Sequence, residues 1–263
     1  MRLSICEAMA GRERMATEQF SQLVVVGSSA GGIEALSALL GSLPKDGFPA
    51  PIVIAQHIDP SRPSHLGEIL ARRSTLPVRT IAGTQELEAG VVFVVPANRH
   101  VEITDHSVSL REDRQSGPKP SVDLLLSSAA QAYGEGLVAV ILSGTGSDGA
   151  AGAHRVKQSG GTVIIENPET AHYPGMPQSL SPATVDIVAN LDKIGPLLHD
   201  LLTGAYVPTR PDTEQTLDTF LDELRERSGI DFNSYKRPTI QRRLRRRMVA
   251  TGTRNLEEYL AHM

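Results

Sequence analysis

Strand-like apolar runs alternate with helix-like segments along most of the chain, and this alternation constrains the fold more than any other feature. Continuous apolar strands separated by helices indicate a parallel sheet that is covered on both faces. The runs begin at Leu23, Ile52, Val78, Val91, Leu137 and Thr162, and the helix-like segments are 33–40, 66–73, 121–133, 150–158 and 190–202. The chain is therefore expected to form a doubly wound α/β domain with a mainly parallel sheet.

Two local patterns add detail to this prediction. Residues 101–104 and 107–110 alternate around Asp105 and His106, which predicts an antiparallel hairpin inserted in or beside the sheet. Ser121 is expected to cap the helix that follows, with Asp123 in its first turn complementing the helix dipole.

The residue pattern changes at 203–211, where TGAYVPTRP has two prolines and no hydrophobic periodicity. Only helical patterns follow, and in 239–250 Ile240, Leu244 and Met248 form a thin apolar stripe among five arginines. Residues 213–263 carry ten Lys/Arg against eight Asp/Glu, whereas 1–212 carry sixteen against twenty-two. We expect a leader at 1–21, an α/β domain at 22–202, a linker at 203–212 and a small all-α domain at 213–263.

Composition excludes several classes of protein. The only cysteine, Cys6, rules out an internal disulfide framework and a thiolate metal cluster, and it fits a reducing compartment. No apolar run approaches the length of a membrane span, and the N-terminus has no signal-like apolar core. These features predict a cytoplasmic protein that does not insert into membranes.

The first strand runs into GSSAGG, which ends at Gly32 and places Ser28 and Ser29 at a turn before a helix. A serine at this position can be a nucleophile. The same turn can instead cradle a phosphate or simply cap the helix.

In a parallel α/β sheet, reactive groups gather beyond the carboxyl ends of the strands. Ser28 and Ser29 follow the first strand, His57 follows the second, and Asp148 lies in SGTGSDGAAG after the strand that begins at Leu137. A serine, a histidine base and a carboxylate that fixes the imidazole make up an acyl-transfer triad. Two alternatives remain at this point: His57 could belong to a plain loop, and Asp148 could be the N-cap of the helix at 150–158.

Five segments together resemble the catalytic domain of the chemotaxis protein-glutamate methylesterases. They are GSSAGG, AQHI at 55–58, GVVFVVPANRHVEI at 90–103, KPSVDLLLSSAA at 119–130 and ILSGTGSDGAAG at 141–152, and YPGMPQSL at 173–180 follows the same pattern. That resemblance implies a serine hydrolase that removes the γ-methyl ester from receptor glutamates, and the family often also deamidates receptor glutamines. Such a hydrolase is expected to need no metal or other cofactor.

By position, the resemblance assigns Ser29 as nucleophile, His57 as base and Asp148 as the triad carboxylate. Backbone N–H groups near Gly31 and Gly32 would bind the oxyanion. Thr145 stands where many members have a methionine, which is a departure from the family pattern.

Residues 220–248 and 255–260 resemble the N-terminal helical domain of the chemotaxis receptor methyltransferases. The chain would then be the front part of an esterase–methyltransferase fusion. Because about twenty residues precede the first strand, we expect no regulation by a receiver domain in cis, and the fusion would be cut before the region that binds S-adenosylmethionine. The implied partners are a methyl-accepting chemoreceptor as substrate and its acidic helices as a contact for the arginine-rich helix, which favours a receptor over nucleic acid.

Two other classes of function stay open on the sequence. One is a non-enzymatic phosphate- or dinucleotide-binding module, although the turn is not GxGxxG and no acidic residue ends the second strand. The other is a catalytically inactive scaffold that binds receptors.

Overall fold

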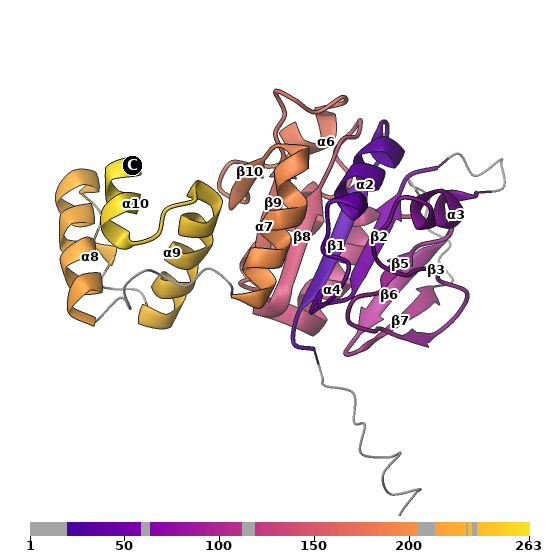
Figure 1. Ribbon diagram of the computed structural model, residues 1–263, viewed down its shortest axis with the longest axis horizontal. Helices are drawn as coiled ribbons and strands as arrows, with labels where there is room; N and C mark the ends of the chain where they lie inside the picture. The colour runs from indigo at the N-terminus through magenta and orange to yellow at the C-terminus, as the bar shows by residue number, and fades with distance from the viewer. Residues whose placement is uncertain (1–19, 59–63, 112–118, 205–213, 230, 233–235) are drawn as a thin grey trace, which may run out of the picture.

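The computed structural model describes residues 20–58, 64–111, 119–204, 214–229, 231–232 and 236–263, without the side chains of 214–216, 228, 242 and 250. We call residues 20–204 the α/β part and residues 214–263 the helical part (Figure 1). Most of the expected leader and linker lies outside the described residues. The described end of the expected linker differs from the prediction, because helix α7 (Leu191–Thr203) continues through Thr203.

Seven parallel strands form the central sheet in the order β10-β9-β8-β1-β2-β5-β3. Their bounds are β1 Leu23–Ser28, β2 Ile52–Gln56, β3 Val78–Thr80, β5 Val92–Val94, β8 Leu137–Ile141, β9 Thr162–Glu166 and β10 Ile187–Ala189. The chain moves outward from β1 through β2 and then returns to β8 on the other side of β1. This reversal is the topological switch point of a doubly wound sheet, so the predicted fold class is confirmed.

Helices cover both faces of the sheet, as the apolar strands require. On one face, α4 (Val122–Tyr133) and α5 (Ala150–Gln158) pack with β1 and β8 in one apolar core. On the other face, a second core contains α2 (Gly32–Gly41), α3 (Leu66–Ala71) and α7. Burial of Val, Ile, Leu and Ala side chains on both faces is the main source of stability.

The expected hairpin is present as β6 (His100–Thr104) and β7 (Ser107–Arg111). With β4 (Gln85–Glu86) it forms a separate three-stranded antiparallel sheet, which packs beside α4. Four short elements were not predicted from the sequence: β4, β10, the 3₁₀ turn η1 (Gly134–Gly136) and α6 (Gly175–Gln178). All four have two to four residues, too few for a periodic pattern to be visible.

The helical part consists of α8 (Glu214–Ser228), α9 (Arg237–Thr251) and α10 (Leu256–His262). Its small core includes the predicted stripe, with Ile240 and Met248 buried and Leu244 packed against them. Figure 1 shows these three helices together at one end of the molecule, with α9 on the side of α7 and β10. Among the residues described, no helix combines the length and apolar character needed to cross a membrane.

Candidate active site

The β1–α2 turn and the end of β2 leave the sheet side by side. Ser28 pairs with Gln56 in the register of the two parallel strands, and the His57 N–H donates to the Ser28 carbonyl at 3.1 Å. Ser29 and His57 each follow that pair by one residue, and adjacent strands lie about 4.8 Å apart. The structure therefore brings both residues to the carboxyl edge of the sheet, at the switch point.

Asp148 reaches His57 from the loop after β8. Its Oδ2 lies 2.8 Å from His57 Nε2, and the two side chains are 11% and 16% exposed. This pair is largely shielded from water, so its electrostatic interaction is stronger than that of an exposed pair. The same loop approaches Ser29, since a Cβ placed on Gly144 would lie 2.9 Å from Ser29 Cβ.

Asp148 caps α4, a helix that comes before it in the chain, and not α5, which follows it. Its carboxylate accepts hydrogen bonds from the N–H groups of Val122 and Asp123 and from Ser121 Oγ, at the N-terminus of α4. The N-cap of α5 is Gly149, which makes no side-chain capping bond. The interpretation of Asp148 as an N-cap of the following helix is therefore wrong.

Asp123, in turn, binds the N-terminus of α5. Its Oδ1 accepts from the N–H groups of Gly149 and Gly152 in the first turn of α5, at 2.9 and 2.6 Å. Each aspartate thus binds the N-terminus of the other's helix, where the helix dipole favours negative charge. Ser121 caps α4 as predicted, because its side chain accepts from the Leu124 N–H.

This environment shifts the pKa values of Asp123 and Asp148 in opposite directions. Burial acts to raise the pKa of Asp148, but hydrogen bonds from His57, Asp123 and Val122 outweigh it and leave the pKa below its usual value. The pKa of Asp123 is raised, first by burial and then by the negative charge of Asp148, against the lowering effect of its bonds to Gly152 and Gly149. Asp148 is thereby kept ionised beside the imidazole.

Gln56 holds the backbone carbonyls of both Ser29 and His57. Its buried side chain donates from Nε2 to the Ser29 carbonyl at 2.7 Å and to the His57 carbonyl at 2.8 Å. Its Oε1 accepts from Ser28 Oγ at 2.6 Å, so Ser28 points into the protein and is fully buried. This orientation distinguishes the two serines, which the turn's residue pattern alone left equivalent.

Ser143 and Glu166 support the loop that carries Asp148. The Ser143 carbonyl accepts a hydrogen bond from the Ser29 N–H at 3.0 Å. The Ser143 N–H donates to the carboxylate of buried Glu166 at 2.7 Å. Glu166 was not predicted from the sequence, although its place at the end of β9 satisfies the same strand-end rule that selected His57. Within the described ranges, no group of three or more His, Cys, Asp or Glu side chains is placed to hold a metal ion.

Replacing Glu166 by glutamine is expected to raise the free energy of unfolding near pH 7. Burial raises the pKa of Glu166, so the wild-type chain loses stability as pH rises through that value, while glutamine keeps an oxygen for the Ser143 N–H. Urea unfolding between pH 4 and 8 measures the difference, with Glu169→Gln as an exposed control. A Glu166→Gln variant that is less stable than wild type at every pH would contradict this account.

Comparison with known proteins decides the family. The sequence model of the CheB methylesterase family matches residues 24–198, which include Ser29, His57 and Asp148. The chain belongs to the CheB methylesterase family. A second model, the all-alpha domain of CheR methyltransferases, matches residues 215–263, so the predicted pairing of the two families is confirmed.

Among curated CheB-type relatives, a putative protein-glutamate methylesterase/protein-glutamine glutaminase of Leptospira interrogans is 37% identical over 180 residues, covering 67% of this chain and 92% of the relative. A Thermotoga maritima protein-glutamate methylesterase/protein-glutamine glutaminase is 38% identical over 164 residues, covering 60% of this chain and 47% of that protein. The crystal structure of the Thermotoga maritima CheB methylesterase catalytic domain superposes with a TM-score of 0.63 at 37% identity, covering 68% of this chain and 98% of that one.

Proposed function

We propose that the chain is a serine hydrolase that removes the γ-methyl ester from glutamate residues of a chemoreceptor, with Ser29, His57 and Asp148 as its catalytic residues. The observation that carries this proposal is the shielded 2.8 Å contact between His57 and Asp148 beside Ser29. Membership of the CheB family and the names of the relatives support the reaction. Those names also support a glutamine deamidation at the same site, in which ammonia leaves in place of methanol.

The hydrogen bond to Asp148 sets the direction of proton transfer. Since His57 Nε2–H is donated to the carboxylate, Nδ1 carries the lone pair and acts as the base for Ser29 Oγ. Ser29 attacks the ester carbonyl, and His57 returns the proton to the departing methoxide, which leaves as methanol. Water, deprotonated by the same nitrogen, then hydrolyses the acyl-enzyme to free glutamate and Ser29.

The backbone around Ser29 narrows the choice of oxyanion donors. The Ser29 N–H donates to the Ser143 carbonyl, and the Gly32 N–H donates to the Ser29 carbonyl at 2.9 Å. We therefore assign the N–H groups of Ala30 and Gly31, and not that of Gly32, as the donors that stabilise the oxyanion. One such donor typically raises the rate by about 100- to 1,000-fold. Thr145 is exposed on the loop that also carries Asp148.

The function is tested by incubating the full chain with a methylated receptor fragment and measuring methanol release and the glutamates formed. A fluorophosphonate probe should label Ser29 in the same preparation. Calorimetric titration with nicotinamide and flavin nucleotides tests the binding-module alternative. Nucleotide binding without methanol release or labelling would overturn the hydrolase proposal, and receptor binding without either activity would favour an inactive scaffold.

The helical part suggests how the receptor is contacted. Arg243 and Arg247 are exposed on α9, and guanidinium groups bind carboxylates through oriented donors. We propose that this surface meets the acidic helices of the receptor. Binding of receptor fragments should weaken as salt rises, because contacts between exposed charges are screened.

Replacing Gln56 by leucine is expected to lower kcat roughly 100-fold with little change in KM. The substitution removes both bonds that hold the Ser29 and His57 carbonyls, and misplacement of catalytic groups by about 1 Å can cost that factor. Steady-state methanol release measures the effect. The control is Ser28→Ala, which leaves both Gln56 donor bonds intact, and an equal loss in the two variants would contradict a positioning role for Gln56.

A further inference from the structure

Helices α4 and α5 end at the edge of the sheet opposite to the candidate active site. Their C-termini leave main-chain carbonyls without intrahelical partners and carry the negative end of each helix dipole. After α4 this region contains Glu135 in the 3₁₀ turn, and after α5 it contains Gly160 and Gly161. The base of the sheet between β8 and β9 is thus electronegative even without a carboxylate.

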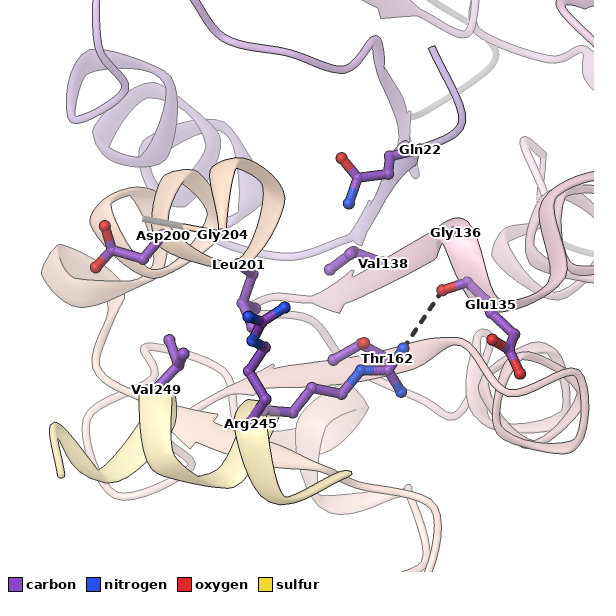
Figure 2. A pocket seen from close by; sticks show the side chains of 11 residues that line it. Gln22, Glu135, Gly136, Val138, Thr162, Asp200, Leu201, Gly204, Arg245 and Val249 are labelled. Atoms are coloured by element: carbon purple, nitrogen blue, oxygen red, sulfur yellow. Dashed lines mark hydrogen bonds between the residues drawn. The ribbon is translucent and has the colours of Figure 1, made fainter. Parts of the chain in front are cut away.

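The guanidinium of Arg246 in the helical part reaches into this region. Arg246 Nη1 donates to the carbonyls of Gly160 and Gly161 at 3.0 and 3.2 Å, and Nη2 donates to the Glu135 carbonyl at 3.3 Å. The dashed line in Figure 2 marks the bond that ends on Glu135. A planar guanidinium with several donors fits three diverging carbonyls, which a lysine ammonium would do less well.

Apolar packing accompanies this polar contact. Val249, one turn after Arg246, packs against the α/β core that includes Leu198 and Leu202 of α7. A cavity of about 180 Å³ remains between α9 and the base of the sheet, and Figure 2 shows Arg245 extending from α9 toward Leu201. Helix α9 therefore contacts the α/β part through both a charged and an apolar side chain.

We propose that the base of the α/β sheet is a docking site for helix α9 of this chain, and that Arg246 is the residue that holds it there. The two parts then move as one unit, with the docked helix at the edge remote from Ser29. Arg246 faces the α/β part, whereas Arg243 and Arg247 on the same helix are exposed.

The test compares Arg246→Glu with Arg247→Glu in the full chain. Both variants make the same charge change one residue apart on one helix, but only the first places a carboxylate against carbonyl oxygens. Charge-assisted bonds are worth roughly 10- to 100-fold in an equilibrium, so Arg246→Glu should shift docking by at least that factor. Backbone ¹⁵N relaxation measures whether the two parts share one rotational correlation time.

The expected result is one common correlation time for wild type and Arg247→Glu, and a shorter value for the helical part of Arg246→Glu alone. Chemical shifts of α8 and α10 report whether the helical part of each variant stays folded, and chemical shifts of the central strands report the same for the α/β part. Separate correlation times in the wild type would overturn the proposal. So would a common correlation time in Arg246→Glu, or separation in both variants.

Discussion

A Ser29→Ala variant is expected to release methanol from a methylated receptor at least about 10⁴ times more slowly than the wild type. Alanine removes the only atom that forms the acyl-enzyme, while the turn that holds it keeps its backbone bonds to Ser143 and Gln56. Residual activity would come from the oxyanion donors and substrate binding alone. Single-turnover methanol release measures the loss, and receptor binding should be unchanged.

Ser28→Ala is the matched control for this prediction. Ser28 is one residue earlier, carries the same hydroxyl and is fully buried, with its Oγ bonded to Gln56. Removing the Ser28 hydroxyl should lower the rate of methanol release by no more than about tenfold, which corresponds to the loss of one neutral hydrogen bond. If Ser28→Ala lost activity and Ser29→Ala kept it, the assignment of the nucleophile would be wrong.

The alternation of apolar runs was enough to predict the layered fold, because each long strand is buried on both faces. Val24, Val25 and Val26 on β1 have no exposed surface, as a continuous apolar run predicts. Helix α5 begins and ends at the residues expected for it. The partners of each strand in the sheet were beyond prediction, since the periodicity of one strand does not identify its neighbour.

The proposed catalytic residues of the candidate site were predicted from the sequence, but the hydrogen bonds that hold Asp148 were not. Strand ends selected Ser29, His57 and Asp148 as a group, and the resemblance chose between the two serines. The exchange of caps between Asp123 and Asp148 joins residues 25 apart through tertiary packing of α4 on α5. The position of Asp123 in the first turn of α4 agrees with the prediction, whereas the local rule for Asp148 pointed to α5 instead of α4.

The pair of aspartates gives the second large prediction. Asp148→Asn is expected to lower kcat by about 10⁴-fold, because an amide cannot stabilise the imidazolium or hold the same tautomer. It should also destabilise the fold by about 1–3 kcal/mol. Asp148 accepts on both oxygens, from His57 and Val122 on Oδ2 and from Asp123 on Oδ1, and asparagine offers only one acceptor oxygen.

Asp123→Asn is the matched control, because Gly149 and Gly152 donate to the same oxygen and asparagine can accept both bonds. The two variants should differ in the sign of their pH dependence. The lowered pKa of Asp148 contributes stability above the unfolded-state value that is lost on acidification, so the Asp148→Asn penalty should shrink as pH falls.

The raised pKa of Asp123 acts in the opposite sense, because the wild-type chain loses stability as pH rises through it. Asp123→Asn should therefore gain stability relative to wild type as pH rises. Urea unfolding of both variants between pH 3 and 8 measures these trends. Parallel pH profiles would show that the two carboxyls are equivalent helix caps, whereas opposite slopes would show that the fold keeps one of them charged beside the imidazole.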